Sequence, residues 1–332
     1  MRSGLRRWIG IAFKIAALAL VAAIIAGIIY ERVGELRDRK RFPQIGHSVD
    51  IGGRSLNIYC SGEGSPTVIL EGDLGSPGYS WVLIQREVAK FARTCWYDHA
   101  GYGWSDPGPF PHHSDAIARD LHKLLVAAHV PPPYVLVGHG LGAFHVRVYR
   151  GFYPSEVAGL VLVDPLNEDM TIHIHNHNEA FRPTVLLIFR ALGAMGFFRR
   201  HIPSADRPPV GMTRNEWTTI LHLSWQSKSV VETLKEVPFW VDGEQARASG
   251  SFGDIPVEVL SAGIQDQDGD PKLDSNHPLK MELQERLARL STRGTRTVVS
   301  NSGHRIPLEA PNSVITAVRE VVAQVRQDRR MP

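Results

Sequence analysis

Short apolar runs that end in glycine or a turn, each followed by a helical pattern, recur along most of this chain. The clearest example is YVLVGHGLGAFHVRVYR at 134–150, where an apolar run passes through a turn with three alternating glycines into a helical pattern. Runs such as PTVILEGD at 66–73 are apolar almost throughout, as expected of strands buried on both faces. Strands that alternate with helices predict an α/β fold with a mostly parallel, doubly wound sheet.

The alternation is interrupted between residues 166 and 250, where the pattern is mainly helical. Ligands of open α/β sheets bind at the carboxyl ends of the strands, so an insertion there can act as a lid. We therefore expect a helical cap at 166–250 over a core formed by 48–165 and 251–328. The apolar segment at 184–198, TVLLIFRALGAMGFF, is expected to form the core of the lid, with an acyl pocket or a membrane-facing surface as alternatives.

An apolar segment near the N-terminus, Trp8 to Tyr30, carries Lys14 as its only charge. As a helix it would be about 34 Å long, enough for a hydrocarbon core of roughly 30 Å. Its length favours a retained anchor over a cleaved signal peptide. We expect a cytoplasmic tip and single-pass transmembrane anchor at 1–30 and a linker at 31–47. Basic residues flank both ends of the segment, so they do not fix its orientation alone.

The basic charge is concentrated beside this segment. The net charge is +3, but the first 41 residues hold nine of the 37 Lys and Arg and three of the 34 Asp and Glu. The remainder has 28 basic and 31 acidic residues and is slightly acidic. A basic surface for phosphates is not indicated, and nucleic-acid binding has no support.

The chain has two cysteines, Cys60 at the end of the run SLNIYC and Cys95 within TCWYD. Neighbouring strands would permit a disulfide, which would place the domain outside the cytoplasm. Two small buried thiols explain the same pattern equally well.

Several motifs follow one another in a recognisable order. The turn GHGLG has the spacing of a nucleophile elbow, G-x-S-x-G, but its central residue is Gly140. Asp266 follows the apolar run VEVLSAG, and His304 lies in SGHRIPLEAP before the last helical pattern. The stretch YDHAGYGWSDPG at 97–108 is a further motif, and it is similar to a known pattern in which arginine is usual at the position of His99.

Together these motifs resemble the α/β-hydrolase family (AB hydrolase-1 type). The resemblance implies the α/β-hydrolase fold, with nucleophile, acid and histidine at positions 140, 266 and 304. Asp268, Asp270 and Asp164 stay open as alternative acids.

The resemblance also implies an oxyanion hole formed by the backbone N–H of Leu141 and by a donor in EGDLGSPG, either Asp73 or Leu74. The family's frequent His-Gly in that loop is here Glu71-Gly72. In the family's strand order Cys60 and Cys95 lie on adjacent strands, which favours the disulfide.

Glycine at position 140 removes the hydroxyl that would attack an acyl carbon. Loss of the serine alone costs about a million-fold in kcat in a well-studied serine protease. The sequence therefore predicts an impaired serine hydrolase, although a water activated by His304 could take over part of the attack. A natural pseudoenzyme, an introduced variant and an enzyme with altered chemistry all explain Gly140.

The histidines of TIHIHNHNE at 171–179 alternate, so an extended chain would place His173, His175 and His177 on one side, with Glu179 nearby. Such a set could bind zinc or copper, but a solvated polar loop fits better, and no metal or organic cofactor is implied. His139, beside the elbow, is expected to pack or to form hydrogen bonds.

From these observations we expect a membrane-anchored protein of the serine ester or amide hydrolase type, impaired by Gly140. Its expected partners are the lipid bilayer and a small hydrophobic ester or amide. The alternative is a non-catalytic pseudohydrolase that binds a small hydrophobic ligand or a protein partner.

Overall fold

The computed structural model describes residues 2–170, 183–236, 239–264 and 277–329, and all structural statements refer to these residues. They form one eight-stranded sheet in the order β1-β2-β4-β3-β5-β6-β7-β8. The pairs β1–β2 and β2–β4 are antiparallel, and all other neighbours are parallel. The strands are β1 (His47–Asp50), β2 (Ser55–Ser61), β3 (Thr67–Glu71), β4 (Thr94–Tyr97), β5 (Tyr134–His139), β6 (Val157–Val163), β7 (Val257–Ala262) and β8 (Gly294–Val299).

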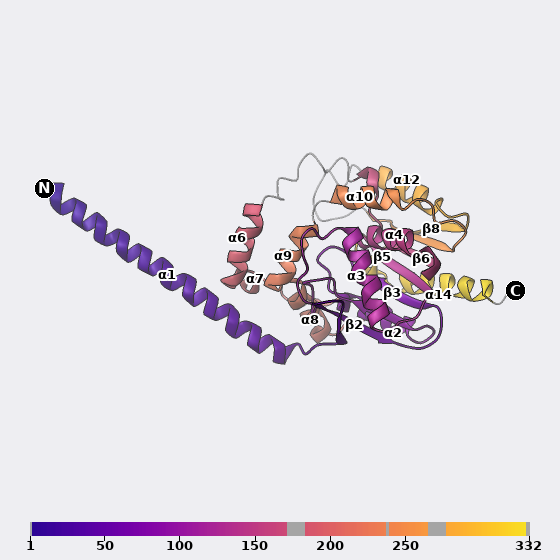
Figure 1. Cartoon of the computed structure of the whole chain (residues 1–332), viewed down its shortest axis with the longest axis horizontal. Coiled ribbons are helices and arrows are strands. Elements are labelled where there is room, and N and C mark those ends of the chain that lie inside the picture. Colours follow the sequence, from indigo (N-terminus) through magenta and orange to yellow (C-terminus); the bar gives the residue numbers. More distant parts are fainter. Residues whose placement is uncertain (1, 171–182, 237–238, 265–276, 330–332) are drawn as a thin grey trace.

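Helices cover both faces of the sheet (Figure 1). One face packs against α3 (Ser114–Ala127), α4 (Gly142–Phe152) and α12 (His277–Ala288), and the other against α2 (Val82–Val88) and α14 (Pro311–Asp328). Strands β3, β5 and β6 are almost wholly buried, because apolar side chains face a helix layer on either side. The predicted mostly parallel, doubly wound sheet is confirmed.

Further helices lie between β6 and β7 in the sequence. Those within 183–236 lie toward the N-terminal helix, whereas the one at 239–248 packs against α3 and α4 (Figure 1). Apolar α6 packs against α9, and its Leu187 and Ile188 side chains are 67% and 55% exposed. The helices are α6 (Pro183–Ala194), α7 (Phe197–Arg200), α8 (Arg214–Ser224), α9 (Ser227–Glu236) and α10 (Phe239–Ala248).

The N-terminal helix α1 (Arg2–Arg41) extends away from the sheet (Figure 1). It is long and apolar enough to cross a membrane, and its most apolar stretch is not buried against the other described residues. Its last turns contact the helices between β6 and β7. Glu31 accepts hydrogen bonds from Arg199 Nε at 2.8 Å and from Ser227 Oγ at 2.9 Å, and the Arg200 guanidinium lies 4.9 Å from the centre of the Tyr30 ring.

Cys60 on β2 and Cys95 on β4 face one another across the antiparallel pair and form a disulfide, with Cα atoms 4.1 Å apart. The bond ties the antiparallel edge of the sheet to its parallel centre. Its two ends are 35 residues apart in the sequence.

We expect the double substitution Cys60→Ser and Cys95→Ser to lower the free energy of unfolding by about 3–4 kcal/mol, because a cross-link over this span restricts the unfolded chain. Urea unfolding of the full chain in detergent, followed by tryptophan fluorescence, measures the change. An unfolding midpoint unchanged by the double substitution would show that the disulfide does not contribute to stability.

Candidate functional site

The turn between β5 and α4 is tight, and its glycines are needed for two different reasons. Gly140 has φ +54°, in the left-handed region that side chains rarely adopt, and its N–H donates to the carbonyl of Val163 at 3.0 Å. A Cβ atom on Gly142 would overlap the carbonyl oxygen of Gly72, in the loop after β3. The turn therefore brings position 140 up against the loop that holds Asp73.

The side chain of Asp73 lies directly over Gly140. A Cβ atom built on Gly140 would overlap the carboxylate of Asp73. Asp73 Oδ1 accepts a hydrogen bond of 2.7 Å from the Leu141 N–H. The carboxylate thus lies where a side chain at position 140 would begin, and it uses the N–H group expected to bind an oxyanion.

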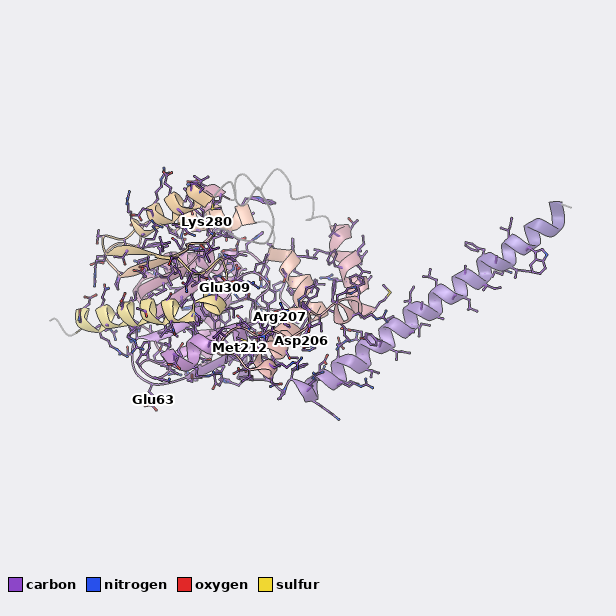
Figure 2. The ribbon with its side chains drawn as sticks, turned by 180° about the vertical axis from the view of Figure 1, so that it is seen from behind. Glu63, Asp206, Arg207, Met212, Lys280 and Glu309 are labelled. Carbon is purple, nitrogen blue, oxygen red and sulfur yellow. A yellow bond between two sulfur atoms is a disulfide. The ribbon has the colours of Figure 1, made fainter. Side chains whose placement is uncertain are left out.

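His304 lies between two carboxylates. Its Nε2 is 2.8 Å from Asp73 Oδ2, and its Nδ1 is 2.7 Å from Asp164 Oδ2. The His139 ring stacks on the His304 ring with centres 4.7 Å apart, and His139 Nε2 donates to the His304 carbonyl at 2.8 Å. Glu309, labelled in Figure 2, accepts from the Gly303 N–H at 2.8 Å and holds the loop before His304. Backbone and side chain of His304 are therefore both fixed.

Asp164 is buried at the end of β6 with φ +41°. Its carboxylate is hydrogen-bonded by Lys280 Nζ, by Gln284 Nε2 at 3.1 Å and by the Ala262 N–H at 3.2 Å (Lys280 is labelled in Figure 2). Residues from β7 and α12 thus hold the carboxylate that orients His304.

These contacts shift the pKa values of all three groups. Burial alone would raise the pKa of Asp73, but the hydrogen bond and charge of His304 hold it well below its usual range. Asp164 has a lowered pKa for the same reason, with a further contribution from Lys280. Burial would lower the pKa of His304, yet its hydrogen bonds to Asp164 and Asp73 raise it to about 10. At neutral pH an imidazolium therefore lies between two carboxylates, and the Lys280 ammonium balances the second negative charge.

The structure brings together residues named from the sequence: Gly140, Leu141, Asp73, His304 and the alternative acid Asp164. From the sequence, Asp73 was expected to contribute its backbone N–H to an oxyanion hole. In the structure its side-chain carboxylate contacts Leu141 and His304. Asp266, Asp268 and Asp270 lie outside the described residues. Among the described residues, Asp164 holds the acid's place at His304 Nδ1. Asp164 ends an apolar strand in the sequence, and that signal identified it as an alternative.

Two residues that depart from the family pattern contact one another beneath the Asp73 loop. Glu71 ends β3, His99 follows β4, and Glu71 Oε1 is hydrogen-bonded to His99 Nε2. Both side chains are buried. The sequence did not indicate this contact, because the two residues are 28 positions apart in the chain.

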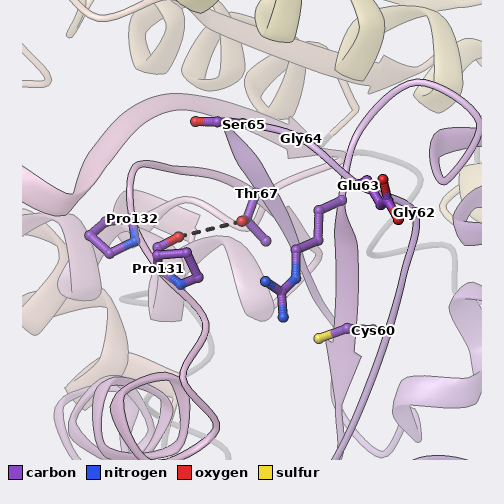
Figure 3. Close-up of a pocket in the computed structure, with 9 residues that line it drawn as sticks. Cys60, Gly62, Glu63, Gly64, Ser65, Thr67, Pro131 and Pro132 are labelled. Carbon is purple, nitrogen blue, oxygen red and sulfur yellow. Dashed lines mark hydrogen bonds between the residues drawn. The ribbon is translucent and has the colours of Figure 1, made fainter.

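A pocket lies at the opposite ends of the strands from Asp73, Gly140 and His304. It is lined by residues at the start of β3 and by Pro131 and Pro132, and Thr67 Oγ1 donates to the Pro131 carbonyl at 3.4 Å (Figure 3). Asp73, Gly140 and His304 lie at the other ends of the strands, so the pocket belongs to a different surface.

Comparisons with known proteins agree with the fold. A model of the family described as alpha/beta hydrolase fold matches residues 66–311. An AB hydrolase superfamily protein of Gibberella zeae is 22% identical over 79% of this chain and 87% of its own length. YbdG of Bacillus subtilis is 24% identical over 46% of this chain and 47% of its own length, and an uncharacterized vacuolar membrane protein of Saccharomyces cerevisiae is 30% identical over 30% and 16%. The chain spans less than half the length of the first curated relatives that it matches.

Solved structures show the same fold at low identity. The enol-lactonase of Burkholderia xenovorans has a TM-score of 0.59 at 14% identity over 83% of this chain and all of its own. A thermophilic esterase of Thermogutta terrifontis has a TM-score of 0.58 at 19% identity, covering 84% of this chain and 98% of its own. The epoxide hydrolase CorEH has a TM-score of 0.60 at 17% identity, with the same coverage.

We expect His304 to remain protonated from its ordinary pKa of 6.5 up to about pH 10. Because its pKa is raised in the folded state, its contribution to stability is complete below pH 6.5 and is lost as the pH rises toward 10. The contribution of the two aspartates is lost as the pH falls below their ordinary value of 3.8. Nitrogen NMR of histidine-labelled protein measures the titration of His304.

Asp73→Asn is the matched variant, since it removes one of the two charges and keeps the shape of the side chain. Its His304 signal should titrate at a lower pH than that of the wild type. A wild-type His304 that titrates near pH 6.5 would contradict the hydrogen-bonded arrangement.

Proposed function

Because this chain belongs to the α/β-hydrolase family, we propose that it is a membrane-anchored hydrolase in which the carboxylate of Asp73 replaces the serine nucleophile. The observation that carries this proposal is the placement of that carboxylate over Gly140. One oxygen is bonded to the Leu141 N–H and the other to His304. An ionised carboxylate at this position is a nucleophile, and its lowered pKa keeps it ionised at neutral pH.

The protonated state of His304 bears on the substrate class. A carboxylate that adds to an alkyl ester is expelled again in preference to the more basic alkoxide, so ordinary esters are poor substrates. A strained cyclic ether differs, because its carbon–oxygen bond opens at a tetrahedral carbon and the leaving oxygen needs a proton. His304 holds that proton. An epoxide on a small hydrophobic molecule is therefore the substrate class that the site fits best, and one structural neighbour is an epoxide hydrolase.

The proposed reaction has two balanced steps. In the first, an Asp73 oxygen forms a bond to an epoxide carbon, the ring carbon–oxygen bond breaks, and His304 gives its proton to the leaving oxygen. In the second, neutral His304, oriented by Asp164, takes a proton from a water that attacks the Asp73 ester carbonyl. The bond between the acyl carbon and the diol oxygen then breaks, and the diol oxygen leaves with the second proton of that water. The diol is released, Asp73 is again a carboxylate, and His304 is again protonated. Epoxide and water are consumed, and the enzyme returns to its starting state.

Location is the second part of the proposal. Helix α1 supports anchoring in a membrane, and the Cys60–Cys95 disulfide supports a domain outside the cytoplasm, where disulfides persist. The exposed apolar side chains of Leu187 and Ile188 on α6 lie on the part of the chain that contacts α1. A hydrophobic substrate drawn from the bilayer suits this arrangement.

A non-catalytic pseudohydrolase is the second candidate. The observation that favours it is that Asp73 already uses the Leu141 N–H, the donor that would stabilise the oxyanion of an ester substrate. Serine-type ester hydrolysis is therefore blocked by Asp73 as well as by the missing hydroxyl. Binding of a small hydrophobic ligand or a protein partner without turnover would be the remaining role.

Turnover of a hydrophobic aryl epoxide by the full chain in detergent tests the proposal. We expect Asp73→Asn to reduce the rate at least about 1,000-fold, because an amide is a far weaker nucleophile. Ser76→Ala, in the same loop, is the control and should retain most of the rate. A wild type that binds the epoxide without turning it over would favour the pseudohydrolase. Equal rates for the wild type and Asp73→Asn would overturn the assignment of Asp73.

A second prediction concerns restoration of the serine. We expect Gly140→Ser alone to remain inactive on p-nitrophenyl esters, because its Cβ atom overlaps the Asp73 carboxylate. The double substitution Asp73→Gly and Gly140→Ser frees that space and the Leu141 N–H, and it should hydrolyse these esters at least about 100 times faster than Gly140→Ser. If Gly140→Ser alone is as active as the double variant, Asp73 does not block the site.

A further inference from the structure

A second group of chemically active side chains lies beneath the Asp73 loop, and the reaction proposed above does not use it. Glu71 comes from the end of β3, His99 follows β4, and His145 lies in the first turn of α4. Their exposed fractions are 0%, 5% and 2%. A carboxylate oxygen of Glu71 and one ring nitrogen of each histidine all lie within 4.8 Å of one another. We propose that these three residues form a binding site for a divalent transition-metal ion of the zinc class.

The hydrogen bonds of His145 show which ring nitrogen is available. Ser114 Oγ donates its single proton to Asp242 Oδ1 at 2.7 Å, because an ionised carboxylate can only accept. The contact of 2.8 Å between Ser114 Oγ and His145 Nδ1 must then be donated by His145. Nε2 is left with its lone pair, and no described residue donates a hydrogen bond to it. The His145 side chain is buried, and the Nε2 lone pair is the one that a metal ion would bind.

The other two ligands have partners of the kind that surrounds metal sites. His99 Nδ1 faces Glu236 Oε1 at 3.3 Å, and the second oxygen of Glu236 is held by the Tyr102 hydroxyl at 2.7 Å. The Tyr97 hydroxyl donates to the second oxygen of Glu71. A histidine that ligates a metal through one nitrogen almost always donates the other to a carboxylate, carbonyl or water. In this arrangement the ion takes the place of the proton between His99 and Glu71.

The types of ligand atom in this group favour one class of metal ion. Two imidazole nitrogens and one carboxylate suit zinc, with a fourth position left open, whereas calcium and magnesium prefer oxygen ligands alone. A second group, Asp73, His139 and His304, also has ligand atoms within 4.8 Å. There Asp73 and His304 are paired with one another in the proposed reaction, and His139 Nε2 donates to a carbonyl. The Glu71 group is therefore the better site.

Metal binding by the full chain tests this inference. The protein is purified in detergent without a polyhistidine tag, treated with a chelator, dialysed and titrated with Zn²⁺ by calorimetry. We expect about one tightly bound ion per chain and a raised unfolding temperature, because the ion binds only the folded arrangement. Co²⁺ in place of Zn²⁺ should give the visible absorption bands of a cobalt ion ligated by nitrogen and oxygen, which reports coordination in the unmodified chain.

Variants locate the site. His145→Ala should weaken Zn²⁺ binding at least about 100-fold, and Glu71→Gln should weaken it similarly while keeping the side-chain volume. His122→Ala, on the neighbouring helix α3, is the control and should bind like the wild type. Loss of the tight ion in His304→Gln, or in a variant with His173, His175 and His177 all replaced by alanine, would assign the ion elsewhere and overturn the proposal. Absence of tight binding by the wild type would overturn it as well and leave a proton shared between His99 and Glu71.

Discussion

The hydrogen bonds of the Asp73 carboxylate join the nucleophile elbow to the loop that carries His304. Leu141 from the elbow donates to one oxygen and His304 from the loop after β8 donates to the other, so one side chain joins three loops. This placement requires glycine at position 140, because a Cβ atom there would overlap the carboxylate. Glycine at position 140 and the position of the Asp73 side chain are thus coupled. The charges agree with it, since His304 and Lys280 together balance Asp73 and Asp164.

Much of the fold could be predicted from the sequence, because its elements are defined by local patterns. The run at 134–139 is apolar on both faces and becomes β5, and the glycine turn after it leads into α4 as expected. The apolar segment at 8–30 likewise lies within the long helix α1. Such patterns do not specify how the last turns of α1 contact a helix far along the chain, as Glu31 and Arg199 do.

The site was harder to predict, because its chemistry depends on side chains that meet across the sheet. A sequence shows that Asp73 follows a strand, but not that its carboxylate turns back over Gly140. Asp164 and Asp266 both follow apolar runs, and the sequence alone does not show which of them meets His304. Glu71 and His99 each depart from the family pattern, and only the structure shows that their side chains form a hydrogen bond.

In the proposed reaction the carboxylate at position 73 forms a bond with the substrate. The most direct test is a single turnover of an aryl epoxide in water enriched in ¹⁸O, with enzyme in excess, followed by mass spectrometry of the peptide that contains Asp73. Water attacks the carbonyl carbon of the Asp73 ester in the proposed second step, so we expect one ¹⁸O atom in the Asp73 carboxylate. Label found only in the diol, with none in Asp73, would contradict the account, because water would then attack the substrate directly.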